Sequence, residues 1–214
     1  MAITSHSPIN TKTMHLLPQE LMDPRVINGA REIIQKEIDA EFNDAEQSTL
    51  FQCLDDKTAP ELHVRLNSLV RRKLTMDVPV ELYRGVSQTT LNMLQKLDVG
   101  DSFVTNRVTS FSTDYAIARD FSGSAIYGTH AIFSLRNCPI AFNYKEVILR
   151  MLIAMPDSEF SDSVQRGTQI AMVEREEEWM LPSGTKFQIE EIEDRTTDPL
   201  SRPKVIYHLR FISI

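Results

Sequence analysis

The chain has 214 residues, with 23 Lys and Arg against 30 Asp and Glu, and a formal net charge of −7. This length predicts a single domain, which buries roughly 70% of its unfolded surface and needs no disulfide or metal to fold. The negative charge argues against indiscriminate binding to nucleic acid or anionic membranes, although it leaves room for a local basic patch.

The cysteines and the apolar segments indicate a cytoplasmic protein without membrane contact. Cys53 and Cys138 lack a CxxC spacing and are expected to be free thiols in a reducing compartment. Residues 1–22 contain no apolar run typical of a signal peptide, and the apolar stretch 147–155 is too short to span a bilayer.

The first third of the chain has a helical pattern. Residues 1–17 are polar and are expected to form a flexible tail, followed by a helical part over 18–76. A first helix is predicted from apolar residues at steps of three and four: Val26, Ile27, Ala30, Ile33, Ile34 and Ile38. A second is predicted from Asp44, with Gln47 completing a capping-box-like pair. A third is predicted from near Thr58, with Pro60 in its first turn and Leu62, Leu66, Leu69 and Val70 on one side.

The rest, residues 77–214, is expected to be a β-rich part. Val80, Leu82 and Arg84 alternate with other residues as in a strand, and Ser87 can cap a short helix. Further strands are predicted at 103–105, 108–112, 129–135, 169–174, 178–182, 185–192 and 204–213. The polar stretch 158–168 is predicted to be a loop. Helices followed by strands, with few βαβ units, predict an α+β fold with antiparallel sheets.

The first candidate site motif is Tyr83-Arg84-Gly85-Val86, at the end of a predicted strand. A guanidinium offers a planar fork of donors that matches phosphate oxygens. The adjacent glycine lets the backbone approach a flat ligand. Taken alone, an arginine paired with a surface carboxylate beside a turn glycine is the simpler explanation.

The second motif is Ser110-Phe111-Ser112. Strand alternation places the two serines on one face and Phe111 on the other, and a helix is expected to begin at Thr113 or Asp114. Short hydroxyl groups there can hold carboxylates or ribose hydroxyls. Helix capping and β-propensity explain the same residues when they are taken alone.

The third motif is a run of acidic residues ahead of an apolar strand, comprising Glu174, Glu176, Glu177 and Glu178. Such a run is ordinarily a solvated loop or surface. Strand alternation predicts Glu176 and Glu178 on one face and Glu177 on the other, and Trp179 is expected in the core. Two like charges on one face repel, a cost that functional sites often carry.

Together these three motifs resemble the arginine–serine–glutamate signature of mono-ADP-ribosyltransferases, and the chain is most similar to the Mod family of T-even bacteriophages. The resemblance covers about residues 44–186 and includes Thr105-Asn106-Arg107-Val108 and Glu178-Trp179-Met180. Many members have Ser-Thr-Ser where this chain has Ser-Phe-Ser. A Glu174/Glu176 register is also open, but Glu176/Glu178 is preferred because the family's second glutamate directly precedes the apolar strand.

The resemblance implies a helical segment packed on two antiparallel β-sheets that form an NAD cleft, with NAD as substrate, no metal, and arginine as acceptor. The implied catalytic residues are Arg84, Ser110, Glu176 and Glu178. The implied NAD-binding residues are Arg84, Gly85, Ser110, Ser112 and Phe121. Residues 121–128 would form a flap over the nicotinamide, and the loop 158–176 would recognise the acceptor.

The implied partners are host proteins of the translation or transcription machinery, in the cytoplasm of an infected bacterium, with the enzyme acting as a monomer. A basic cluster suggests RNA binding, with NAD-capped RNA as a further donor, although helix-end solvation also explains it: Arg65, Arg71, Arg72 and Lys73. An inactive RNA- or protein-binding module and an NAD glycohydrolase stay open as alternatives. A zinc enzyme is not favoured, because the histidines lack ligand spacing.

Overall fold

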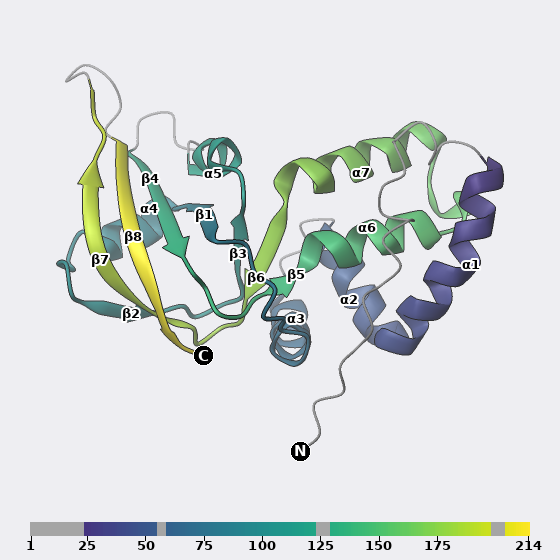
Figure 1. Ribbon diagram of the computed structural model, residues 1–214, viewed down its shortest axis with the longest axis horizontal. Helices are drawn as coiled ribbons and strands as arrows, with labels where there is room; N and C mark the ends of the chain where they lie inside the picture. Colours follow the sequence, from purple (N-terminus) through teal and green to yellow (C-terminus); the bar gives the residue numbers. More distant parts are fainter. Residues whose placement is uncertain (1–23, 55–58, 123–128, 198–203) are drawn as a thin grey trace.

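Helices gather at one end of the computed structural model and most of the strands at the other (Figure 1). The structure describes residues 24–54, 59–122, 129–197 and 204–214, so the predicted tail over residues 1–17 lies outside the described residues. The α-helices are α1 (Pro24–Glu41), α2 (Asp44–Leu54), α3 (Pro60–Arg72), α4 (Gln88–Leu94), α5 (Tyr115–Ser122), α6 (Tyr144–Ala154) and α7 (Ser163–Glu176). A 3₁₀ turn, η1 (Asp157–Glu159), precedes α7.

The apolar spacing correctly predicts the first three helices, with two corrections of detail. All four residues of the predicted α3 stripe are buried, as are Ile34 and Ile38 of α1, but Ile33 is 61% exposed. Helix α2 begins at Asp44 as expected. Its capping box is formed by Asn43 and Glu46, whose side chains each accept a hydrogen bond from the other's backbone N–H at 3.0 and 2.9 Å. The box therefore lies one residue earlier than the predicted Asp44 and Gln47 pair.

The prediction of a loop over 158–168 and a strand over 169–174 is wrong, because most of this segment is α7. Asp162 caps the helix by accepting a hydrogen bond from the Gln165 backbone N–H at 2.8 Å. Ile170 and Val173, three residues apart, are buried in the helical core. The short stretch 169–174 fits a period of two as well as a helical face, and packing against α6 selects the helix.

The apolar stretch 147–155 lies almost entirely in α6, which the sequence pattern left without a structure. Seven residues of α6 are buried: Tyr144, Val147, Ile148, Arg150, Met151, Leu152 and Ala154. The side chain of Arg150 is held by Glu41 of the α1 end at 2.9 Å. Among the helices that the structure describes, none combines the length and apolar composition needed to cross a membrane.

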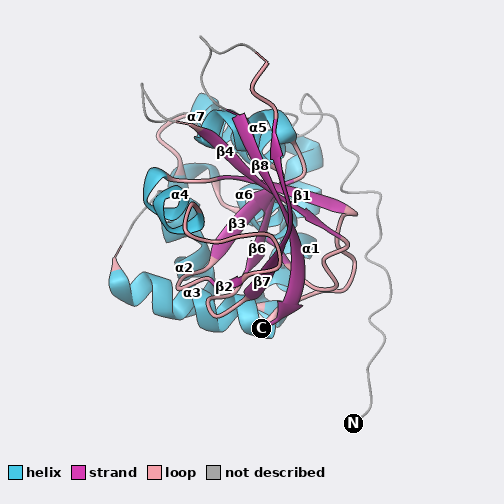
Figure 2. Cartoon of the chain, turned by 90° about the vertical axis from the view of Figure 1, so that its left-hand side faces the viewer, coloured by secondary structure: helices cyan, strands magenta, loops and turns pink. Residues whose placement is uncertain are grey.

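The strands form one sheet of eight in the order β2-β7-β8-β4-β1-β3-β6-β5. Their bounds are β1 (Glu81–Gly85), β2 (Ser102–Val104), β3 (Thr109–Ser112), β4 (His130–Arg136), β5 (Phe142–Asn143), β6 (Glu178–Leu181), β7 (Lys186–Asp194) and β8 (Lys204–Ser213). The α+β prediction is confirmed, but the sheet is continuous and mixed, since β4 and β8 pair in parallel. Two separate antiparallel sheets were expected. Figure 2 looks onto the twisted sheet with α4 and α5 beside it.

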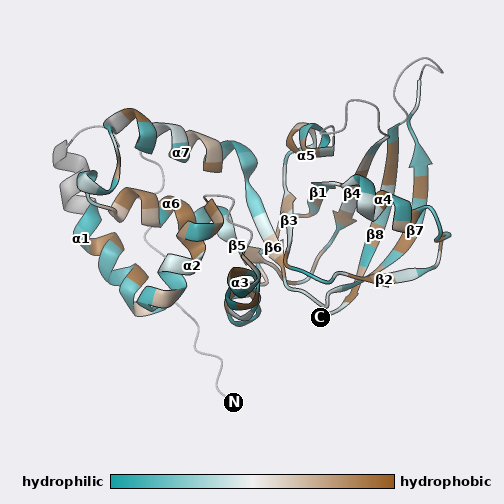
Figure 3. Ribbon diagram, turned by 180° about the vertical axis from the view of Figure 1, so that it is seen from behind, coloured by the Kyte–Doolittle hydropathy of each residue, from teal (hydrophilic) through white to brown (hydrophobic). Residues whose placement is uncertain are grey.

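Two hydrophobic cores divide the molecule into a helical half and a sheet half. The helical core, in the helical half, joins α1, α2, α3, α6 and α7 with β5, whereas the sheet core, in the sheet half, joins α4 with all strands except β5. Figure 3 shows hydrophobic and hydrophilic residues alternating around the helices and along β7 and β8. Strand β6 belongs to both cores, because Met180 is buried in the helical core and Trp179 and Leu181 in the sheet core. A site at β6 is therefore built by both halves.

Candidate active site

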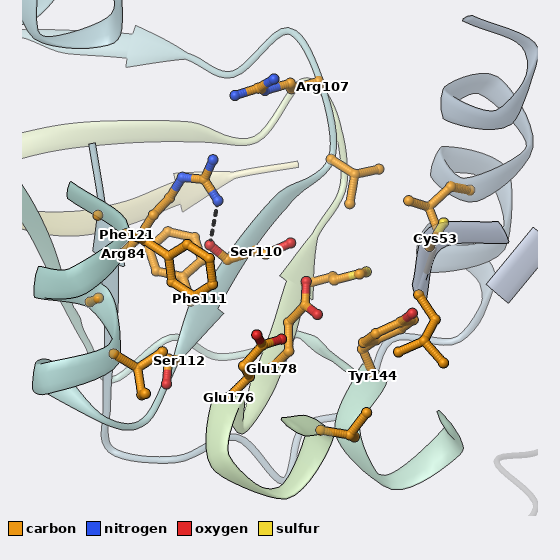
Figure 4. Close-up of a pocket in the computed structure, with 18 of the residues that line it drawn as sticks. Cys53, Arg84, Arg107, Ser110, Phe111, Ser112, Phe121, Tyr144, Glu176 and Glu178 are labelled. Carbon is orange, nitrogen blue, oxygen red and sulfur yellow. Dashed lines mark hydrogen bonds between the residues drawn. The ribbon is translucent and has the colours of Figure 1, made fainter. Parts of the chain in front are cut away.

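A cleft of about 490 Å³ opens between the helical half and the sheet half, beside β6 (Figure 4). Its walls come from α2, α3, β1, β3, α5, α6, α7 and β6. The structure brings all seven predicted site residues to this one cleft: Arg84, Gly85, Ser110, Ser112, Phe121, Glu176 and Glu178. Three segments far apart in the sequence thus meet around one space, as expected.

Arg84 lies near the end of β1 and is fixed by its neighbour strand. Its Nη1 donates a hydrogen bond to the backbone carbonyl oxygen of Ser110 at 2.6 Å, which joins the first motif to the second (Figure 4). The pKa of Arg84 is lowered to about 10, mainly by burial and also by like-charge repulsion from Arg107, while the charge of Glu178 acts in the opposite direction. The guanidinium still carries its positive charge at neutral pH, in a place where a bound anion would relieve the repulsion.

Gly85 also lines the cleft, and the structure shows a second reason why this position has no side chain. An added Cβ would lie 2.3 Å from the backbone oxygen of Ala118 and 2.5 Å from the backbone nitrogen of Ser122. Both of these atoms belong to α5, so the glycine lets α5 pack directly against β1. The sequence prediction concerned only the access of a ligand to Gly85 and did not include the packing of α5 on β1.

The two serines of β3 face the cleft on the strand next to β6. Ser112 is paired with Glu178 and Ser110 with Met180, and directly opposed residues share a face of the sheet. In Figure 4 the Ser110 side chain points toward Glu178. The Ser112 hydroxyl accepts a hydrogen bond from the backbone N–H of Asp114 at 3.0 Å, just ahead of α5. Phe111 is buried in the sheet core, which confirms the predicted alternation.

Glu176 and Glu178 both line the cleft, but not by the predicted strand alternation. Glu176 is the last residue of α7 and Glu178 the first of β6, and Glu177 between them has the left-handed φ of 46° and ψ of 50°. The reversal at Glu177 brings its two neighbours side by side (Figure 4). Glu174 is exposed on α7 and does not line the cleft, so the preferred Glu176/Glu178 register fits the structure. Trp179 is buried, as predicted.

Several cleft residues were missed by the sequence patterns. Arg107 is an exposed side chain at the Arg84 end, and the only signal for it was the segment Thr105-Asn106-Arg107-Val108 of the family resemblance. Cys53 and Tyr144 lie at the opposite wall in Figure 4, and the Tyr144 hydroxyl donates a hydrogen bond to the Leu50 backbone oxygen at 3.1 Å. Burial, with the nearby charge of Glu178, raises the pKa of Cys53 to about 12. The segments Gln52-Cys53 and Ala141-Phe142-Asn143-Tyr144 also belong to the family resemblance, but it gave neither residue a role.

Two weaker predictions about the cleft margins have different outcomes. The loop expected to recognise the acceptor over residues 158–176 is largely α7, and only its carboxyl end, at Met172, Val173 and Glu176, reaches the cleft. Phe121 lines the cleft with 60% of its surface exposed. The remainder of the predicted flap, residues 123–128, lies outside the described residues.

The charged side chains of the cleft are separated by sign along its length. Arg84 and Arg107 extend toward one another at one end, whereas the carboxylates of Glu176 and Glu178 lie toward the other, with Ser110 between them (Figure 4). This arrangement can bind an anionic group at one end and stabilise a developing cation at the other. Both properties suit a dinucleotide whose phosphates and reactive ribose lie a few bonds apart.

The chain matches a model of the bacteriophage T4 Mod ADP-ribosyltransferases over residues 13–206. It is 38% identical over 165 residues to the NAD–protein ADP-ribosyltransferase ModB of Enterobacteria phage T4, covering 73% of this chain and 78% of ModB. The Vis toxin of Vibrio splendidus, an ADP-ribosyltransferase solved with an inhibitor, has the same fold. That match has a TM-score of 0.50 and 17% identity and covers 91% of this chain and 90% of Vis. The chain therefore belongs to the Mod family of NAD-dependent ADP-ribosyltransferases.

Proposed function

We propose that this enzyme transfers ADP-ribose from NAD to arginine side chains of host proteins, and that Arg84, Ser110, Glu176 and Glu178 carry the reaction. The observation on which the proposal depends is the pair of glutamates at the α7–β6 junction, in the same cleft as two arginines. A single acidic residue would suffice to cleave NAD, whereas an acceptor as basic as arginine calls for a second.

The arginine end of the cleft is proposed to hold the pyrophosphate of NAD. Arg84 is fixed in direction by its bond to Ser110, and the exposed Arg107 adds a second positive charge beside it. Guanidinium groups bind phosphate oxygens through paired donors, and binding would remove the repulsion between these two cations. With the phosphates placed there, the nicotinamide ribose extends toward Ser110 and the glutamates, and Ser112, Gly85 and Phe121 line the space for nicotinamide.

Glu178 is proposed to stabilise the reacting ribose. The bond between C1′ and the nicotinamide nitrogen breaks, its electron pair stays on nicotinamide, and C1′ becomes cationic. A fixed carboxylate that accepts a hydrogen bond from the ribose 2′-hydroxyl stabilises that charge, as in glycoside hydrolysis. Ser110, which points toward Glu178 from β3, would hold the carboxylate and the ribose in place.

Glu176 is proposed to serve the acceptor. A free guanidinium stays protonated at neutral pH and is then a poor nucleophile. A carboxylate beside the C1′ position orients the guanidinium by paired hydrogen bonds, and it accepts one proton as the N–C1′ bond forms. Glu176 ends α7, with Met172 one turn before it, so this end of α7 becomes the proposed acceptor-binding margin in place of the predicted loop.

The proposed setting follows from the phage relative. ModB is described as modifying proteins, and the present enzyme is proposed to modify proteins of the translation or transcription machinery in the cytoplasm of an infected bacterium, acting as a monomer. Incubation of host lysate with labelled NAD, followed by identification of the labelled protein and its linkage, tests this. A product labile to hydroxylamine under conditions typical of arginine linkages is expected, and a nucleic-acid product would contradict it.

NAD-capped RNA stays a prediction as a second donor, and the basic cluster now gives it less support. The four side chains of that cluster contact the protein itself: Arg65 binds Gln52, Arg71 the Ser183 carbonyl, Arg72 the Glu46 carboxylate, and Lys73 the Glu41 carbonyl. A transfer assay with labelled NAD-capped RNA is decisive, because labelling no stronger than with uncapped RNA would discard this donor.

The acceptor role of Glu176 is tested by separating transfer from hydrolysis. Agmatine is a small guanidine acceptor, and hydrolysis is measured as nicotinamide release without it. Glu176→Gln is expected to abolish transfer to agmatine while retaining part of the hydrolysis. The proposed role of Glu176 is to accept a proton from the guanidinium, and hydrolysis involves no guanidinium. Glu174→Gln is the matched control, since Glu174 is exposed and lies outside the cleft. Undiminished transfer by Glu176→Gln would remove Glu176 from this role.

A further inference from the structure

We infer that Glu177, the residue between the two glutamates, is a positioning residue that fixes Glu176 and Glu178 relative to each other by tying their junction to both halves of the enzyme. The inference rests on the proposed function of the two glutamates. Glu177 itself does not line the cleft, so it acts through its neighbours.

The backbone at Glu177 is the first observation. Its φ of 46° lies in the left-handed region, where Glu is uncommon and Gly or Asn is the usual choice at a helix end. The conformation ends α7, with the Glu177 N–H bonded to the Val173 carbonyl oxygen at 3.2 Å, and turns the chain into β6. A glycine would adopt the same turn without steric cost, so the side chain of Glu177 calls for another explanation.

The contacts of the side chain supply that explanation. One carboxylate oxygen is paired with Nζ of Lys145 at 2.7 Å, and the other accepts a hydrogen bond from the Thr113 hydroxyl. Lys145 is in the first turn of α6, in the helical half, and Thr113 lies between β3 and α5, in the sheet half. The carboxylate of Glu177 therefore ties the α7–β6 junction to the strand of the serines on one side and to α6 on the other.

The exposure of the Lys145–Glu177 ion pair indicates that it positions the chain more than it stabilises the fold. The side chains of Lys145 and Glu177 are 29% and 40% exposed. Ion pairs this open to water contribute little to folding stability. They can nevertheless restrict the direction of the chain, and a displacement of about 1 Å in a reacting group can cost up to roughly 10²-fold in rate. Loss of the contact should thus disturb the reaction more than the fold.

The effect should fall on kcat for transfer rather than on NAD binding. Arg84 is held through β1 and β3 and does not depend on Glu177. Glu176 must meet the acceptor while Glu178 stabilises the ribose, so transfer needs both carboxylates in place at once. Hydrolysis needs only Glu178, whose backbone is also held by its pairing with Ser112.

The experiment compares four variants in the agmatine transfer and hydrolysis assays. Glu177→Gly keeps the left-handed turn and removes the carboxylate, and Lys145→Met removes the partner cation. Both are expected to lower kcat for transfer by roughly tenfold, to lower hydrolysis less, and to leave KM for NAD within about twofold. Lys145→Arg retains the cation and should keep most of the transfer activity. Glu174→Gln, one turn earlier on α7, should behave as the unsubstituted enzyme.

Three results would overturn the inference: wild-type kcat for transfer in both Glu177→Gly and Lys145→Met, equal losses of transfer and hydrolysis, or a loss that matches the unfolded fraction measured by circular dichroism. Glu176→Gln and Glu178→Ala are measured alongside. If these two keep their transfer activity, the proposed function fails. If they lose it while Glu177→Gly and Lys145→Met do not, only the positioning role fails.

Discussion

The two halves of the enzyme contribute to the cleft in different ways. The sheet half presents Arg84, Ser110 and Ser112 from neighbouring strands, whose spacing is set by backbone hydrogen bonds. The helical half presents Glu176 from the end of a helix, which is held by side-chain packing and by Glu177. The sheet half thus forms a wall whose residues are spaced by the sheet itself, and the helical half forms an edge whose position depends on a few side-chain contacts.

The largest expected effect comes from Glu178, where the two halves meet. Glu178→Ala should lower turnover by at least about 10²–10³-fold, as for the loss of one preorganised electrostatic contact. Nicotinamide release measures it, and a tryptophan fluorescence titration with NAD checks that binding persists. Weaker NAD binding with unchanged turnover at saturating NAD would instead assign Glu178 to NAD binding.

The independence of the two cores can be tested within β6 itself. Met180→Ala opens the helical core and Leu181→Ala the sheet core, and each should reduce the free energy of unfolding by about 2–5 kcal/mol. Trp179, the only tryptophan of the chain, reports on the sheet core by fluorescence, while circular dichroism at 222 nm reports on the helices. If the halves unfold separately, Met180→Ala will shift the helical transition in urea and leave the fluorescence transition in place. Coincident transitions would show that β6 couples them.

A pair of glycines, one in each half, should respond in opposite directions. Gly85→Ala places a Cβ against the α5 backbone and should destabilise the protein by about 1–3 kcal/mol. Gly167, in α7, has no atom within 4 Å of an added Cβ. Gly167→Ala should therefore stabilise the protein by about 0.5–1 kcal/mol through helix propensity. Melting temperatures measure both, and equal shifts would contradict the close packing of α5 on β1.

The smallest expected effect is a pH dependence in the sheet half. Burial alone would raise the pKa of Glu81, but hydrogen bonds from Ser134, Tyr83 and Arg136 outweigh it and lower the pKa below its usual value of 4.5. Such a carboxylate stabilises the fold above the unfolded pKa, and this is lost as the pH falls through the lower folded pKa. Glu81→Gln should cost under about 1 kcal/mol at pH 7. Urea denaturation at pH 7 and in acid should show that difference disappearing.

The sequence patterns predicted those parts of the fold that local periodicity determines. The strand over 204–213 and the buried stripe of α3 are as expected, because each has a clear period of its own. Helix α7 was missed, because its few apolar residues show no clear helical period and the helix is selected by packing against α6. The parallel pairing of β4 with β8 depends on contacts between distant segments, which no local pattern contains.

The candidate site shows the same division. The motifs identified the residues that meet in the cleft, yet they gave the wrong reason for the proximity of Glu176 and Glu178. Strand alternation was assumed, whereas a left-handed residue at the end of a helix brings them together. Arg107 and Cys53 lie in segments of the family resemblance but were given no role, because a lone arginine or cysteine has no spacing that indicates one. The roles of the seven predicted residues stay predictions.

The high pKa of Cys53 bears on the chemical selectivity of the enzyme. A thiol with a pKa of about 12 is ionised in only about one molecule in 10⁵ at pH 7. The thiolate is the reactive form of cysteine, so Cys53 is expected to react slowly with alkylating reagents at neutral pH. The burial and the carboxylate that suppress its ionisation therefore leave Cys53 as a neutral, apolar part of the cleft wall.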